Sequence, residues 1–269
     1  MPDTHVQFVG SIPEKYDEYL GPLFFHFYAE DLANRIKPGE GRKVLELACG
    51  TGICTEILRR VLPADIEIVA TDLNEPMLDY ARKKRGGLDN VIYQQADALS
   101  LPYEDEAFDV VVCQFGVMFF PDKLAALREA QRVLRSGGQL LFNVWDSFDF
   151  NPIARLAFET IGQFFTDDPP TFMQLPFGYH QIDPIKALLH ECGFSNLQVN
   201  VVKTVSEQPS ANHLADGLVT GNPNILEIQE RASAPPEEVI AALEEAITAK
   251  FGNNPVRTPL QAITFSAFR

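Results

Sequence analysis

The sequence predicts an α/β fold in which a largely parallel sheet is covered by helices. In the first half of the chain, short runs rich in β-branched residues alternate with longer segments of helical periodicity, as in parallel sheets. A glycine turn at 49–52 joins the first predicted strand to the first predicted helix. Hydrophobic residues make up 46% of the chain, which is ordinary for a globular protein and excludes a disordered one.

The predicted elements of this half are well marked. Glu75–Lys84 carries acids early and bases late, as a helix dipole favours. The predicted strands are Lys43–Ala48, Ile66–Thr71, Val91–Gln95, Phe108–Gln114 and Gln139–Val144, and the predicted helices are Gly52–Leu62, Glu75–Lys84 and Pro121–Arg135.

The second half is less regular. A helix is expected from Asp183 as N-cap to Cys192, and another over Pro235–Phe251. Leu197–Val205 and Leu260–Phe268 read as strands. We expect one domain with a helical N-terminal extension and a helical insertion between its last two strands.

Charge and cysteine usage restrict the class of protein. The chain has 22 Lys and Arg against 37 Asp and Glu, whereas nucleic-acid binders need a basic surface. The basic cluster Arg82–Arg85 is interpreted as the solvated last turn of a helix. The N-terminus lacks the pattern of a secretory signal, and the longest apolar run, Val110–Phe120, is too short to span a bilayer. The four cysteines form no CxxC pair, which favours reduced thiols in a cytoplasmic protein.

The strongest local signal is the turn V-L-E-L-A-C-G-T-G at 44–52. Glycine lets a ligand approach the backbone at the carboxyl end of a strand. Thr55 replaces the third glycine of the dinucleotide pattern, and Glu46 just before the turn would repel a pyrophosphate but attract a cation. Asp72 ends the second strand, where a carboxylate can accept ribose hydroxyls, and Asp97 follows the third.

The segments V-L-E-L-A-C-G-T-G, A-T-D-L-N-E-P-M-L, Q-A-D-A-L-S-L-P and F-D-V-V-V-C-Q-F-G-V-M-F-F resemble successive motifs of class I S-adenosylmethionine-dependent methyltransferases. The small-molecule branch with the ubiquinone and menaquinone methyltransferases is the most similar type. The resemblance covers about Tyr16 to Trp145 and is generic beyond Asp146. It implies a Rossmann-like, seven-stranded, mostly parallel sheet whose last strand is antiparallel.

The resemblance also implies roles for particular residues. Glu46, Ala48, Gly50 and Gly52 would line the methionine end of the cofactor, and Asp72 would hold the ribose. The remaining cofactor contacts would be Leu73 and Met77 beside the adenine, Asp97 and Ala98 at its amine, Gln114 and Phe115 near the sulfonium, and Tyr16 from a helical lid. The chain would then divide into a lid (1–40), a cofactor-binding core (41–146) and a substrate-side cap (147–269).

Each of these residues also has a simpler interpretation. Glu46 could bond to nearby backbone N–H groups, and Asp72 and Asp97 could be turn or helix caps. Tyr16 fits a buried helix face as well as a lid.

The sequence gives no compelling general base. A base is needed only for a hydroxyl or carbon acceptor, and His180 is the first candidate, with His26 second. The aromatic-rich stretch Phe142–Phe177 could line an apolar substrate pocket or pack the cap onto the sheet.

Three functions therefore stay open. The first is methyl transfer to a small, hydrophobic or aromatic molecule by a monomer or homodimer that holds neither metal nor nucleic acid. The second, a nicotinamide-dependent dehydrogenase, is disfavoured by Thr55, Glu46 and Asp97. The third is a non-catalytic S-adenosylmethionine-binding regulator, which would keep every one of these motifs.

Overall fold

The protein is described by a computed structural model that covers residues 8–37 and 43–269. Its chain forms two compact units, which we call the sheet unit and the helical unit. The sheet unit comprises His26–Trp145, Tyr179–Val202 and Ala262–Arg269, and the helical unit comprises Met1–Phe25, Asp146–Gly178 and Lys203–Gln261. The expected boundary at 40/41 and residues 1–7 lie outside the described residues. The division into lid, core and cap stays a prediction.

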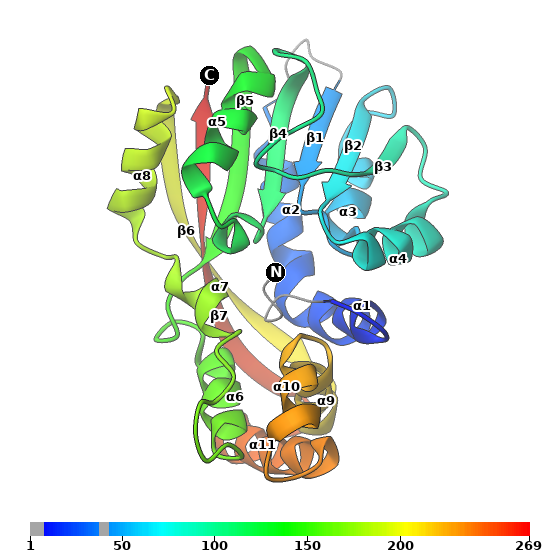
Figure 1. The fold of residues 1–269 in the computed structure, drawn as a ribbon, viewed down its shortest axis with the longest axis vertical. Coiled ribbons are helices and arrows are strands. Elements are labelled where there is room, and N and C mark those ends of the chain that lie inside the picture. The colour runs from blue at the N-terminus through cyan, green and yellow to red at the C-terminus, as the bar shows by residue number, and fades with distance from the viewer. Residues whose placement is uncertain (1–7, 38–42) are drawn as a thin grey trace. The chain divides into compact units, whose positions relative to one another are not determined.

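A seven-stranded sheet, in the order β3-β2-β1-β4-β5-β7-β6, runs through the part of the chain that the structure describes (Figure 1). The strands β1 to β5 pair in parallel, and β7 is antiparallel to β5. The predicted α/β class and antiparallel last strand are thereby confirmed. The bounds are β1 Lys43–Leu47, β2 Glu67–Asp72, β3 Val91–Gln95, β4 Phe108–Gln114, β5 Leu134–Trp145, β6 Ser195–Gln208 and β7 Val256–Phe268.

The central strands are mostly hydrophobic, because helices cover both faces of a parallel sheet. In β1, Val44, Leu45 and Leu47 are all buried, as is nearly all of β4. Five α-helices of the sheet unit surround these strands: α2 His26–Asn34, α3 Ile53–Val61, α4 Glu75–Arg85, α5 Lys123–Val133 and α8 Ile182–Glu191.

Helix boundaries follow local capping where polar caps are present. The side chain of Asn74 accepts from the Met77 N–H at the start of α4, and Asp122 caps α5 in the same way. Several predicted boundaries were wrong, among them the start of β5, both ends of β6 and the start of β7. The helix expected to run to Arg135 ends at Val133, because Leu134 already pairs with Phe108 in the sheet, and α8 begins at Ile182, before Asp183.

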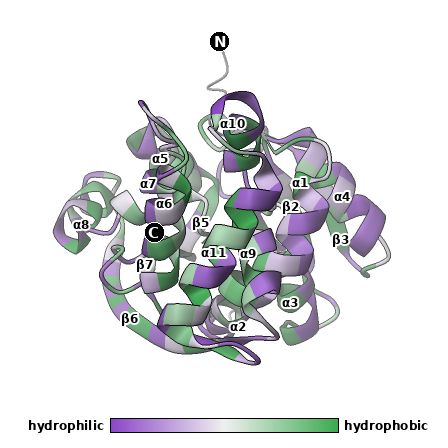
Figure 2. Cartoon of the chain, turned by 90° about the horizontal axis from the view of Figure 1, so that it is seen from below, coloured by the Kyte–Doolittle hydropathy of each residue, from purple (hydrophilic) through white to green (hydrophobic). Residues whose placement is uncertain are grey.

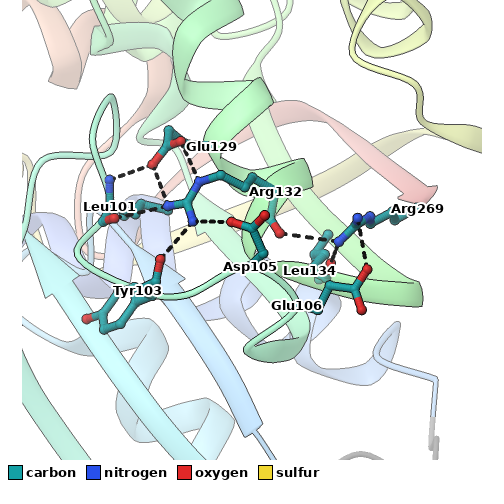
Figure 3. A network of polar contacts seen from close by, with 8 residues as sticks. All are labelled: Leu101, Tyr103, Asp105, Glu106, Glu129, Arg132, Leu134 and Arg269. Carbon is teal, nitrogen blue, oxygen red and sulfur yellow. Dashed lines mark hydrogen bonds and ion pairs between the residues drawn. The ribbon is translucent and has the colours of Figure 1, made fainter.

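An arginine network fixes the loop after β3 to α5 (Figure 3). The guanidinium of Arg132 donates to the carbonyls of Leu101 and Tyr103 and pairs with Glu129 and Asp105. Glu129 also accepts from the Leu101 N–H at 2.7 Å. The loop that carries the third predicted motif is therefore anchored by partly buried hydrogen bonds and ion pairs.

The helical unit is built mainly from two groups of helices. At its N-terminal side, α1 (Ile12–Lys15) continues into a π-helix, η2 (Tyr16–Phe25). The helical insertion expected between the last two strands is confirmed as α9 (Ala211–Thr220), α10 (Asn224–Arg231) and α11 (Pro236–Phe251), and α6 (Pro152–Gly162) and α7 (Gln174–Gly178) precede them.

The longest helix, α11, is amphipathic. It buries Val239, Leu243 and Ile247, which are spaced four residues apart, while hydrophilic residues show on its outer surface in Figure 2. No helix among residues 8–37 and 43–269 is long and apolar enough to cross a membrane.

Candidate functional site

The glycine turn after β1 has the unusual backbone that its sequence predicts. Ala48, Gly50 and Gly52 all lie in the left-handed region, with φ of 53°, 56° and 84°. The N–H of Gly52 donates to the Cys49 carbonyl at 2.9 Å, and α3 begins directly afterwards. The turn therefore presents the N-terminus of α3, where backbone N–H groups are available to a ligand.

Glu46 is buried at the end of β1, with 1% of its surface exposed. The Thr55 hydroxyl donates to its Oε2 at 2.6 Å, whereas Oε1 has no hydrogen-bond partner among the described residues. Burial raises the pKa of Glu46 to about 7, against the opposing effect of the Thr55 hydrogen bond. A buried carboxylate oxygen without a donor is costly and indicates a place for a polar or cationic ligand.

Asp72 ties the second strand to the glycine turn. Its carboxylate accepts from the backbone N–H of Gly50 and of Asn74, both at 2.8 Å. Burial raises its pKa, and these backbone bonds lower it. The capping role considered from the sequence is thus present. A carboxylate has further lone pairs, so two backbone bonds leave acceptor capacity for ribose hydroxyls.

The two residues expected beside the adenine differ in exposure. Leu73 is 64% exposed, whereas Met77 is buried, and its terminal methyl lies 3.5 Å from where a Cβ on Gly50 would be. The side chain of Leu73 can therefore contact a ligand, while Met77 packs against the glycine turn.

The loop after β3 holds the other predicted adenine contacts. Asp97 is exposed, and its Oδ1 accepts from the Leu99 N–H at 2.9 Å. Ala98 is buried beside it. The Ala96 N–H bonds to the Asp72 carbonyl at 3.1 Å, so this loop starts next to the end of β2.

An aromatic cluster follows β4. Phe115, with φ of 51°, stacks on Trp145 at 4.0 Å between ring centroids, and both rings meet Tyr28 edge-on. Gln114 is half-buried just before it. A Cβ on Gly116 would lie 2.5 Å from the Ala48 Cβ, so the turns after β1 and β4 are in close contact.

Two predicted residues, Tyr16 and His180, come from other segments of the chain. Tyr16 belongs to the helical unit, where its ring stacks on Phe25 at 4.8 Å. His180 belongs to the sheet unit and is half-buried between α7 and α8, next to Tyr179, whose ring lies under the Lys123 ammonium. Their roles in cofactor binding and catalysis stay predictions.

Several residues of the site were not identified from the sequence. Thr51 is buried, and its hydroxyl has no hydrogen-bond partner among the described residues. Thr55 serves as the hydrogen-bond donor to Glu46. The sequence signal that could have identified this role is its position three residues after Gly52, on the buried face of α3. The interpretation of Arg85 as solvated was wrong, because its side chain is only 6% exposed and bonds to the turn.

All four cysteine thiols are buried and form no disulfide. Three of them, Cys49, Cys54 and Cys113, lie in or near the turn, and burial raises the pKa of each thiol. Neutral, inaccessible thiols are poor nucleophiles. No cluster of His, Cys, Asp or Glu that could hold a metal ion occurs in the described ranges.

The sequence has clear relatives. A family model for a methyltransferase domain matches residues 45–142. The demethylmenaquinone methyltransferase of Staphylococcus saprophyticus is 30% identical over 203 residues, which cover 70% of this chain and 87% of the relative. The ubiquinone/menaquinone biosynthesis C-methyltransferase UbiE of Shewanella oneidensis is 32% identical over 197 residues, or 66% of this chain and 72% of that protein.

Solved structures share the fold. The YcgJ protein of a Bacillus species superposes with a TM-score of 0.59 at 20% identity, covering 91% of this chain and 99% of that one. Phosphoethanolamine N-methyltransferase 2 of Haemonchus contortus gives 0.60 at 14% identity, covering 96% and 56%. From its relatives, its sheet order and its glycine turn, the chain belongs to the class I S-adenosylmethionine-dependent methyltransferases, in the branch that includes the ubiquinone and menaquinone enzymes.

Proposed function

We propose that this methyltransferase transfers the methyl group of S-adenosylmethionine to a small hydrophobic or aromatic molecule. The observation that carries the cofactor site is that two buried oxygens of the glycine-turn region, Glu46 Oε1 and Thr51 Oγ1, have no hydrogen-bond partner within residues 8–37 and 43–269. A ligand with an ammonium and a carboxylate group suits such a pair, since one atom needs a donor and the other can donate.

The other cofactor contacts would come from the ends of β2 and β3. Asp72 would accept from the ribose hydroxyls, Leu73 would cover the adenine, and Asp97 with Ala98 would meet its amine edge. When bound, the cofactor supplies a methyl group already activated by a positive sulfur, so the protein's main task is alignment. Alignment alone can lower a barrier by roughly 7–11 kcal/mol in favourable cases.

The acceptor would lie beside the segment that follows β4. The half-buried Gln114 would supply a polar group there, next to the buried Phe115–Trp145 stack, a combination that suits a ring with an oxygen substituent. One relative is named a demethylmenaquinone methyltransferase and the other a ubiquinone/menaquinone biosynthesis C-methyltransferase, so a quinol is the first acceptor to test.

A hydroxyl or carbon acceptor needs a base, for which we propose His180. His180→Ala should lower turnover by about 100-fold or more while cofactor affinity stays unchanged. The exposed His190 on α8 provides the control, since His190→Ala should keep the native rate. An unaltered rate in His180→Ala would assign His180 a structural role.

The proposed function is tested by binding and turnover together. Calorimetry should give micromolar affinity for S-adenosylhomocysteine and no binding of NADH. A panel of quinols, phenols, amines and acids with labelled methyl donor should then yield methylated product from an aromatic acceptor. Cofactor binding with no acceptor turned over would contradict the proposed reaction and favour a regulatory binder. The expected cytoplasmic location and monomeric or dimeric state stay predictions.

A further inference from the structure

Arg85, the last residue of α4, lies behind the glycine turn. Its Nε donates to Glu56 Oε2 at 2.7 Å, and its Nη1 donates to the Thr51 carbonyl at 2.9 Å. Glu56 stands in the first turn of α3, so one guanidinium bonds both to the turn and to the helix that follows it.

The turn and the arginine are fitted closely to each other. A Cβ on Gly52 would lie 3.1 Å from Arg85 Cδ and 3.4 Å from the Ala81 Cβ. The Arg85 side chain is 6% exposed, while its partner Glu56 is 54% exposed. Burying a guanidinium is expensive unless its donors are satisfied, and here a backbone carbonyl of the turn satisfies one of them.

We propose that Arg85 is a positioning residue for cofactor binding, which holds the Thr51–Gly52 backbone in its binding shape and places a positive charge behind Glu46. This inference rests on the proposed function, because it takes the turn to be the cofactor-binding element. Arg85 itself lies on the α4 side of the turn and acts through Thr51 and Glu56.

The carboxylate of Glu46 is surrounded by titratable groups from several elements. Burial is the main cause that raises the pKa of Glu46, and of the two nearby charges Asp72 raises it and the Arg85 guanidinium lowers it. Groups facing Glu46 come from every neighbouring element: Asp72 on β2, Tyr93 on β3, Arg85 on α4, Cys54 and Thr55 on α3, with Cys49 and Cys113 at the ends of β1 and β4. Among these groups, Arg85 carries the positive charge that favours the ionised form of Glu46.

The main test compares Arg85→Met with Arg82→Met in the full chain. Arg82 stands on the same helix, but it pairs with Glu75 and Asp79 at the surface. Arg85→Met should weaken S-adenosylmethionine binding by at least about tenfold, since a buried charge-assisted bond is lost. Arg82→Met should stay within about twofold of the native affinity.

A second readout separates positioning from mere stability. Without the cation, the pKa of Glu46 should rise, so the pH at which affinity increases should move upward in Arg85→Met. Arg85→Lys keeps the charge but not the planar pair of donors, so it should bind with intermediate affinity at the native pH midpoint. Native affinity and midpoint in a folded Arg85→Met would overturn the proposal.

Two further measurements keep the test decisive. If Arg85→Met fails to fold, Glu56→Gln provides the alternative. It removes the charge of the exposed partner of Arg85 and should weaken S-adenosylmethionine binding several-fold. Native affinity in both Glu56→Gln and Arg85→Lys would refute the inference. Amide hydrogen exchange of 49–56 without ligand should be faster in Arg85→Met than in Arg82→Met. If the native chain binds no cofactor, the proposed function fails, while this exchange comparison still decides whether Arg85 holds the turn.

Discussion

At the scale of single residues, Asp72 combines a structural task with the proposed ribose contact. It holds the N–H groups of Gly50 and Asn74, so replacing it both loosens the turn and removes an acceptor. Asp72→Ala should weaken S-adenosylhomocysteine binding by more than about 1.5 kcal/mol, the scale of a charge-assisted hydrogen bond. Calorimetry measures this loss, and Asp79→Ala, an exposed acid on α4, is the control. Unchanged affinity in a folded Asp72→Ala would refute the ribose assignment.

Glu46 predicts a pH dependence of cofactor binding. Burial raises its pKa to about 7, so near neutral pH part of the free protein carries a proton there. A cationic ligand favours the ionised carboxylate and expels that proton. Affinity for S-adenosylmethionine should therefore rise, by up to about tenfold per pH unit, as the pH increases toward 7, and then level off. Calorimetry in buffers of different ionisation enthalpy should detect the released proton.

Glu46→Gln is the matched variant for this prediction. A glutamine keeps the size of the side chain and an oxygen for the Thr55 hydroxyl, but it cannot titrate. Its affinity should be lower and nearly independent of pH in this range. An unchanged pH profile in Glu46→Gln would show that another group controls binding.

At the scale of elements, the contact between two turns limits what can stand at position 116. A Cβ on Gly116 would lie 2.5 Å from the Ala48 Cβ and 2.7 Å from Cys113 Sγ. Gly116→Ala should destabilise the fold by about 1–3 kcal/mol, because neither neighbour can withdraw cheaply. Urea denaturation measures this, and Gly87→Ala, where a Cβ would meet nothing within 4 Å, should be neutral. Equal stability of both variants would contradict this packing.

Elements were predictable where local pattern and burial agree. The strands β1 to β4 and the helix α4 appear almost at their predicted bounds, because their hydrophobic runs and caps are local signals. The start of β5 was missed, since Leu134 becomes strand only by pairing with Phe108. That pairing is set by a partner distant in sequence, which no local periodicity encodes.

At the scale of the whole molecule, the predicted cofactor residues other than Tyr16 lie in the sheet unit. Leu243 is fully buried in α11 of the helical unit, so Leu243→Ala should cost about 2–5 kcal/mol of stability. Where the protein stays folded, its affinity for S-adenosylhomocysteine should remain within about twofold of native. Calorimetry and thermal unfolding measure the two effects. Weaker binding would indicate that the helical unit, which contains Tyr16, contributes to the cofactor site.

The sequence by itself determined the fold class, the glycine turn and the cofactor class. Those follow from short-range features: alternating strand and helix patterns, glycines where φ must be positive, and acids at the ends of successive strands. Only the tertiary structure decided which polar atoms near the turn have hydrogen-bond partners. It joined Thr55 to Glu46, left the Thr51 hydroxyl without a partner among the described residues, and turned Arg85 inward. The physical reason is that burial and hydrogen bonding depend on neighbours from other elements. The sequence pattern of a charged residue at a helix end is therefore the same whether its side chain is exposed to solvent or packed against a turn.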